Sequence, residues 1–131
     1  MKGIDTNVLA RYLTRDDRDQ YERAKAFMTS ECAADDPGFL HPIVICELVW
    51  VLKAAYKIER ENIASTIEKL LQTREIEIGE RDSVRAAVAM YRSSSADFAD
   101  CLIARLNKNA GCENTVTFDR KAAELDEFVL I

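Results

Sequence analysis

Histidine and closely spaced cysteines, which build most zinc sites, are scarce in this chain. It contains one histidine, His41, and four cysteines, no two of which have the Cys-x-x-Cys spacing. Structural zinc sites use four such ligands at characteristic intervals, so the sequence argues against a zinc protein. Cys46 and Cys101 lie in apolar helical sequence, where a cysteine is expected to be a small buried thiol.

Long apolar runs are missing as well. No run approaches the ~20 residues that a helix needs to cross a bilayer. Met1-Lys2-Gly3-Ile4 leads directly into the predicted fold, without the apolar segment of a secretory signal. We therefore expect a cytoplasmic protein with no membrane partner.

Positive charge is in deficit. The chain has 18 lysine and arginine residues against 23 aspartate and glutamate residues, which gives a net charge of −5 at pH 7. This balance argues against a protein held on nucleic acid by bulk positive charge. It does not exclude a nuclease, because divalent cations bound in an acidic crevice reverse the local electrostatic field.

What the chain does contain is typical of one globular domain. Its 131 residues are 48% hydrophobic and 31% charged, and they include no repeat, linker or low-complexity stretch. We therefore expect a single domain over residues 1–131.

Short strand patterns alternate with amphipathic helix patterns along the chain. After a first strand that ends at Asp5, strands are expected at residues 39–41, 76–78, 115–118 and 128–131. Helices are expected at residues 8–14, 17–31, 43–56, 60–72, 81–91, 98–109 and 120–124. This alternation favours one short, mostly parallel sheet with helices on both faces. The predicted fold class is α/β, a three-layer α/β/α sandwich.

Acidic side chains recur where such a fold would bring them together. Asp5 and Asp119 each follow an apolar strand pattern, and Glu47 and Asp100 interrupt apolar helical sequence. The carboxyl ends of parallel strands form the functional crevice of an open α/β sheet. Magnesium and manganese prefer oxygen ligands from a few convergent carboxylates. The sequence therefore predicts a Mg²⁺ or Mn²⁺ site.

Asp97 and Asp100 are three residues apart, so a helix could present both on one face. Asp97 lies where the helix begins and is also a good N-cap, a role that needs no chemistry. Asp100 is flanked by apolar residues, among which an unpaired buried carboxylate is costly. This contrast favours a functional role for Asp100 over Asp97.

The other acids have structural alternatives too. Glu47 could pair with Lys53, and Asp119 could cap the helix that follows it. Thr6 and Asn7 could cap the first helix or position a ligand. The residues alone leave these alternatives open.

Taken in this order, the motifs resemble those of PIN-domain ribonucleases, and specifically of VapC-type toxins from bacterial toxin–antitoxin pairs. The resemblance spans nearly the whole chain and rests on Ile4-Asp5-Thr6-Asn7-Val8-Leu9, Glu47, Ala96-Asp97-Phe98-Ala99-Asp100-Cys101-Leu102-Ile103-Ala104 and Thr117-Phe118-Asp119. It implies a catalytic and metal-binding set of Asp5, Glu47, Asp100 and Asp119. It implies possible auxiliary roles for Asp97, Thr6, Asn7 and Thr117.

The resemblance further implies a Mg²⁺- or Mn²⁺-dependent endoribonuclease that cleaves structured RNA such as tRNA or rRNA. It implies a homodimer and a VapB-like antitoxin whose basic tail enters the acidic crevice. A housekeeping PIN nuclease in RNA processing and a catalytically inert PIN-like binding module are the alternatives. A haloacid dehalogenase-type phosphatase or a phosphoacceptor receiver domain would want a second acid near Asp5, where this chain has Thr6 and Asn7.

Overall fold

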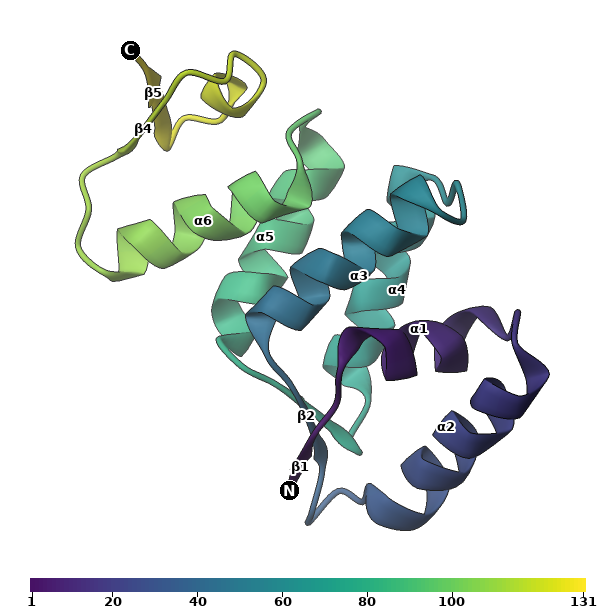
Figure 1. Ribbon diagram of the computed structural model, residues 1–131. Coiled ribbons are helices and arrows are strands. Elements are labelled where there is room, and N and C mark those ends of the chain that lie inside the picture. Colours follow the sequence, from purple (N-terminus) through teal and green to yellow (C-terminus); the bar gives the residue numbers. More distant parts are fainter. The chain divides into compact units, whose positions relative to one another are not determined.

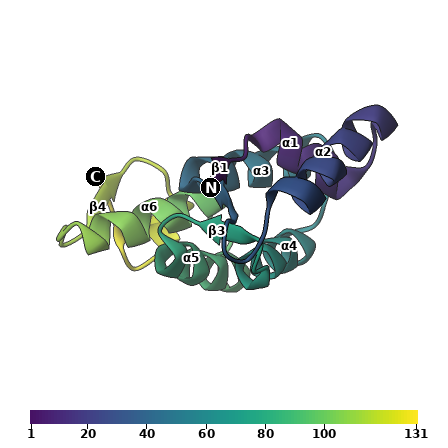
Figure 2. The same ribbon diagram turned by 90° about the horizontal axis from the view of Figure 1, so that it is seen from below.

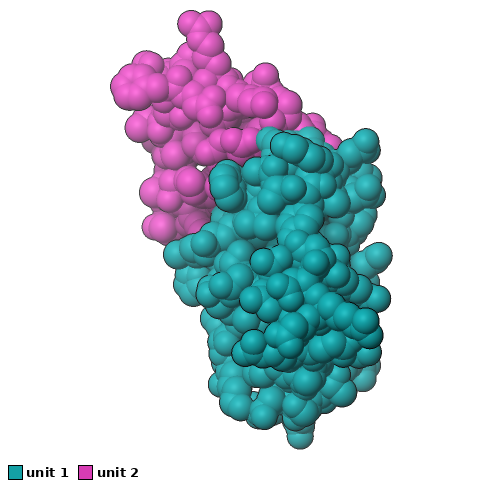
Figure 3. Space-filling model, turned by 45° about the vertical axis from the view of Figure 1, so that its right-hand side comes forward, with its two compact units in different colours: residues 1–81 teal, residues 82–131 magenta.

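The computed structural model describes all 131 residues and divides them into two units, residues 1–81 and residues 82–131 (Figure 3). Each unit contains its own parallel sheet. No helix combines the length and the apolar character that crossing a membrane requires.

The sheet of unit 1 joins three short parallel strands in the order β1-β2-β3. The strands are β1 (Lys2–Gly3), β2 (Gly38–Leu40) and β3 (Ile76–Ile78), and the helices are α1 (Thr6–Thr14), α2 (Arg18–Glu31), α3 (Pro42–Ala54) and α4 (Arg60–Gln72) (Figure 1). Gly3 pairs with Phe39, and Leu40 pairs with Ile78. Figure 2 shows β3 between α4 on one side and α1 and α2 on the other, so helices cover both faces of the sheet.

Apolar spacing explains the helices of unit 1. In α4 the buried residues are Ile63, Ala64, Ile67, Leu70 and Leu71, as the helical period predicts. The α3 helix begins with Pro42, and the Nδ1 atom of His41 accepts a hydrogen bond from the backbone N–H of Ile43 at 3.1 Å. It ends at Ala54, two residues earlier than expected, and Lys57 then takes a left-handed conformation with φ 55°.

Tight packing joins β1 to β2. A Cβ atom added to Gly38 would lie 2.5 Å from Cδ1 of Ile4, so only glycine fits without a shift of that side chain. Ile4 is buried and directly precedes Asp5. The close approach at Gly38 therefore helps to fix the chain where Asp5 begins the first helix.

A polar network joins the end of α1 to the end of α3. The Tyr56 hydroxyl donates to Oδ2 of Asp16 at 2.5 Å, and Nη1 of Arg11 donates to Oδ1 of Asp16 at 2.8 Å. The Tyr56 hydrogen bond, followed by that from Arg11, lowers the pKa of Asp16 to about 2. Asp16 thus connects the end of α1 to the end of α3 within unit 1.

This network predicts an acid-dependent contribution to stability. A carboxyl group whose pKa is lowered by folding stabilises the protein above its ordinary pKa of 3.8, and that contribution is lost as the pH falls toward about 2. We expect the difference in free energy of unfolding between wild type and Asp16→Asn to be constant at neutral pH and to shrink from about pH 4 to pH 2. Tyr56→Phe should raise the pKa of Asp16. Urea unfolding at several pH values tests this, with the exposed Asp19→Asn as control; a difference that does not vary with pH would contradict it.

Unit 2 packs a small parallel sheet with helices. Its elements are α5 (Arg81–Ser93), which starts at the unit boundary, α6 (Phe98–Asn109), β4 (Thr115–Thr117), the 3-10 helix η1 (Ala122–Glu124) and β5 (Phe128–Leu130). Thr115 pairs with Phe128, and Thr117 pairs with Leu130. Tyr91 and Phe98 are buried, with their rings edge to face at 5.8 Å and 81°.

The α/β fold class and the parallel pairing of the strands are confirmed. The expectation that all strands share one sheet requires correction, because they form two sheets, β1-β2-β3 and β4-β5. Apolar periodicity predicts where a strand lies, but the choice of partner depends on tertiary contacts that a local pattern does not record. The prediction of a single domain over residues 1–131 stays a prediction.

Candidate functional site

Asp5 occupies the N-cap position of α1 without using its side chain as a cap. Its backbone is extended, with φ −81° and ψ 159°, and its carbonyl oxygen accepts the N–H of Leu9 at 3.2 Å. The side chain makes no capping hydrogen bond and is exposed. The helix therefore fixes the position of Asp5 while leaving its carboxylate available to a ligand.

Thr6 connects the start of α1 to Glu47. It is buried, and its Oγ1 atom donates to Oε1 of Glu47 at 3.1 Å. Glu47 lies in the second turn of α3 and is exposed, along with Ile43 and Trp50 on the same helix. The sequence left two roles open for Thr6, capping the helix or positioning a ligand. The hydrogen bond observed orients the Glu47 carboxylate, one of the proposed metal ligands. Asn7 is exposed and lines the cavity described below.

Three candidate acids belong to unit 2. Asp97 is the N-cap residue of α6 by position, with an extended backbone at φ −67° and ψ 149°, but its side chain makes no capping hydrogen bond. Asp100 is half-buried in the first turn of the same helix. Burial raises the pKa of Asp100, and the negative charges of Asp97 and Asp119 raise it further. The charges of Asp97 and Asp119 therefore both act on the Asp100 carboxylate.

Asp119 is held in a tight turn after β4. Its Oδ1 atom accepts a hydrogen bond from the backbone N–H of Lys121 at 2.8 Å, and its own N–H donates to Oγ1 of Thr117 at 2.9 Å. The 3-10 helix that follows has Lys121 as its N-cap residue and no side-chain capping hydrogen bond, so Asp119 closes this turn and does not cap the helix. Thr117 acts on the backbone of this turn, and the turn fixes the orientation of the exposed Asp119 carboxylate.

The candidate residues thus form two groups, one in each unit. Asp5, Thr6, Asn7 and Glu47 lie in unit 1, and Asp97, Asp100, Thr117 and Asp119 lie in unit 2. Within neither unit do three or more histidine, cysteine, aspartate or glutamate side chains lie close enough together to hold a metal ion.

The chemistry of the donors nevertheless suits Mg²⁺ or Mn²⁺. Every candidate ligand is a carboxylate, the hard oxygen donor that these ions prefer. Burial raises the pKa of Asp100, the charges of Asp97 and Asp119 raise it further, and a divalent cation would offset that repulsion. The residues present therefore fit a divalent metal.

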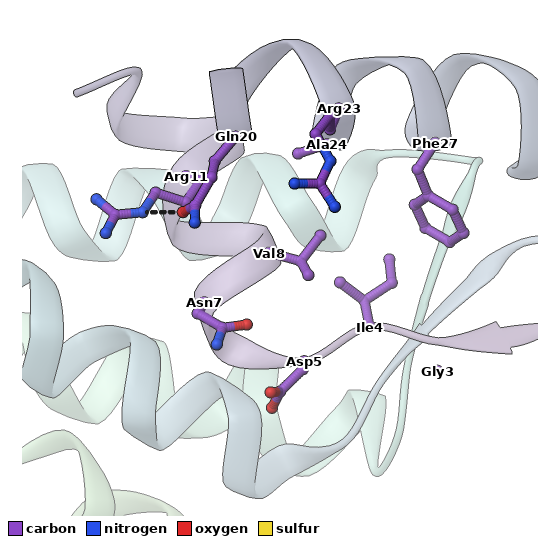
Figure 4. A pocket seen from close by; sticks show the side chains of 10 residues that line it. All are labelled: Gly3, Ile4, Asp5, Asn7, Val8, Arg11, Gln20, Arg23, Ala24 and Phe27. Atoms are coloured by element: carbon purple, nitrogen blue, oxygen red, sulfur yellow. Dashed lines mark hydrogen bonds between the residues drawn. The ribbon is translucent and has the colours of Figure 1, made fainter. Parts of the chain in front are cut away.

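Unit 1 also contains a cavity that the sequence did not predict. It has a volume of about 510 Å³ and lies between α1 and α2 (Figure 4). It is lined by Gly3, Ile4, Asp5, Asn7, Val8, Arg11, Gln20, Arg23, Ala24 and Phe27. These residues come from a strand, a turn and two helices, so no local spacing in the sequence identifies the set.

Comparison with known proteins covers both units. The PIN domain family model matches residues 3–128, a range that includes every candidate acid. A VapC ribonuclease from Aquifex aeolicus (strain VF5) is 30% identical over 125 residues, which cover 95% of this chain and 92% of that protein.

Proposed function

The chain belongs to the PIN-domain family, and we propose that it is a divalent-metal-dependent endoribonuclease, the toxin of a toxin–antitoxin pair. The observation that supports this most strongly is the 30% identity to a VapC ribonuclease over 95% of the chain. The match to the PIN domain family, over residues 3–128, contains the whole carboxylate set. The proposed substrate is structured RNA such as tRNA or rRNA.

In the proposed mechanism, Asp5, Glu47, Asp100 and Asp119 would hold the metal. A bound Mg²⁺ or Mn²⁺ would supply positive charge that activates a water molecule and offsets the negative charge developing on the scissile phosphate. Thr6 holds Glu47 in orientation through its hydrogen bond, and the turn at Thr117 does the same for Asp119. One of the carboxylates accepts the proton of the attacking water, so no protein nucleophile is required.

Asp97 is proposed as an auxiliary acid. Its charge acts on Asp100, and its carboxylate is not used to cap α6. A second negative charge beside Asp100 strengthens the attraction of unit 2 for a divalent cation, even where Asp97 is not itself a ligand.

The proposed protein partners are a VapB-like antitoxin and a second copy of the chain. A basic antitoxin tail would be attracted by the same carboxylates that hold the metal. The α3 helix exposes Ile43 and Trp50, the kind of apolar surface that a homodimer buries. We place the activity in the cytoplasm, which contains RNA and keeps thiols such as Cys32 and Cys101 reduced.

Metal dependence provides the direct test. We expect the purified protein to cleave tRNA or rRNA transcripts in Mg²⁺ or Mn²⁺ and to lose cleavage in EDTA, with activity restored when either ion is added in excess, because the carboxylates alone repel the phosphate backbone. Gel analysis of end-labelled transcripts measures this, and sequencing of RNA ends after brief induction in cells should locate one or a few cleavage sites.

Two outcomes would favour the alternatives. A folded protein that binds RNA but leaves it intact in both ions would be an inert binding module. A protein that cleaves RNA without arresting growth when expressed alone would be a housekeeping nuclease.

A further inference from the structure

The cavity between α1 and α2 has the size and the lining of a ligand site. Its volume of about 510 Å³ falls within the about 300–1,000 Å³ typical of small-molecule pockets. It lies in unit 1 and extends to Asp5, the first of the proposed metal ligands. Nothing in the proposed mechanism uses the rest of its lining.

Apolar and cationic side chains face each other across this cavity. Figure 4 shows Arg23 and Phe27 projecting from α2 toward Ile4 and Val8. Phe27 and Val8 are half-buried, so each presents part of its surface to the cavity. An aromatic ring beside aliphatic groups can stack on a nucleobase, as in many single-strand RNA sites.

The two arginines that line the cavity differ in the strength of their existing hydrogen bonds and ion pairs. Nε of Arg11 donates to Oε1 of Gln20 at 2.7 Å, and its Nη1 atom pairs with Asp16 at 2.8 Å. Arg23 has an ion pair with Asp19 that measures 3.7 Å, between two exposed side chains one helical turn apart. Such pairs are weak in water, so Arg23 is the cation that an incoming anion can recruit.

From this arrangement we propose that the cavity binds one nucleotide of the RNA substrate. The base packs against Phe27 and Val8, and a phosphate group pairs with Arg23. Asn7 and Asp5 lie at the other end of the cavity. The next phosphate of the RNA would therefore be directed toward Asp5, one of the proposed metal ligands. The inference rests on the proposed ribonuclease function for the identity of the ligand.

Charge favours RNA over the basic tail of an antitoxin at this position. Arg11 and Arg23 both line the cavity, and Asp5 is its single acidic residue. At Arg23 a basic peptide would meet like charge, whereas a phosphodiester would meet opposite charge.

Nucleotide binding can be measured without cleavage. We expect the four ribonucleoside 5′-monophosphates, added to the full chain in EDTA, to shift the backbone amide signals of residues 4–8 and 20–27 in NMR spectra. Unphosphorylated nucleosides and inorganic phosphate should each bind more weakly. The nucleosides keep only the contacts with Phe27 and Val8, and phosphate keeps only the contact with Arg23. The absence of nucleotide-induced shifts in these two segments would overturn the proposal. If an arginine-rich peptide shifted these signals instead, the cavity would be a peptide site.

Two arginines of α2 provide a matched pair of variants. Arg23→Gln should weaken nucleotide binding about tenfold, the effect of losing one charge-assisted hydrogen bond to an anion. Arg18→Gln removes the same charge from an exposed residue of α2 that does not line the cavity, and it should bind as wild type does. Equal weakening in both variants would show a bulk charge effect and overturn the proposal.

Cleavage kinetics separate this inference from the proposed function. In Mg²⁺, Arg23→Gln should raise KM for RNA more than it lowers kcat, because the contact is made before and during the reaction. If wild type cleaves RNA and Arg23→Gln has the same KM, the cavity proposal would be overturned and the proposed function would stand. Wild type that cleaves no RNA would overturn the proposed function, and the NMR titration would still decide whether the cavity binds nucleotides.

Discussion

Asp5→Asn and Asp100→Asn are each expected to reduce RNA cleavage at saturating Mg²⁺ by at least about a hundredfold, because each removes a charged ligand from the proposed metal set. Neither change should unfold the protein. Asp5 is exposed and makes no capping hydrogen bond, so its carboxylate contributes little to the stability of α1. The loss is therefore expected in turnover and in metal affinity.

For Asp100 the expected effect on stability has a definite sign. Its pKa is raised on folding, so the folded protein binds the proton more tightly than the unfolded chain does. The ionised form therefore opposes folding at neutral pH, and the metal-free protein gains stability as the pH falls through the raised pKa. Asp100→Asn should be more stable than wild type at pH 7 in EDTA, and it should lack this part of the pH dependence.

Cleavage assays and urea unfolding of the same preparations test both expectations. Asp35→Asn and Asp126→Asn serve as controls, because both residues are exposed acids outside the proposed set, one in each unit. They should retain activity. Full cleavage by either Asp5→Asn or Asp100→Asn would remove that residue from the metal set, and a destabilised Asp100→Asn would contradict the origin assigned to its pKa.

Local sequence patterns predicted the elements of this protein well. The bounds of α4, β3 and α6 agree with those expected, because each has strong apolar periodicity and a clear signal at its ends, such as Gly111 after α6. The end of α3 was set by the left-handed conformation of Lys57, for which the sequence gives no signal. The partners of the strands were predicted less well, because pairing in a sheet depends on contacts between distant segments.

For the candidate site, residue positions were more predictable than side-chain contacts. Asp97 lies at the N-cap as expected, yet its carboxylate does not cap the helix. Thr6 was expected to cap or to position, and its hydrogen bond goes to Glu47, 41 residues away in the chain. The cavity was missed altogether, since Arg23 and Phe27 become neighbours of Val8 only when α1 and α2 pack together. Such contacts are a product of tertiary structure.

Unit 2 offers the largest expected effect on stability, at Phe98. This side chain is 1% exposed and packs edge to face with Tyr91, which is buried to the same extent. Phe98→Ala is expected to lower the free energy of unfolding by about 3–5 kcal/mol, from lost apolar burial and the cavity left behind. Phe118→Ala is the matched control, because Phe118 is 82% exposed, and it should change stability by less than about 0.5 kcal/mol.

The two phenylalanines also flank proposed catalytic acids, so their comparison separates packing from chemistry. Phe98 lies between Asp97 and Asp100 at the start of α6, and Phe118 immediately precedes Asp119. Loss of the Phe98 ring should displace the first turn of α6 and reduce RNA cleavage together with stability, and Phe98→Leu, which keeps much of the apolar volume, should fall between wild type and Phe98→Ala in both. Urea unfolding and cleavage assays of the three variants measure this. Equal stability losses for Phe98→Ala and Phe118→Ala would show that the Tyr91–Phe98 contact does not hold the acidic turn of α6 in place.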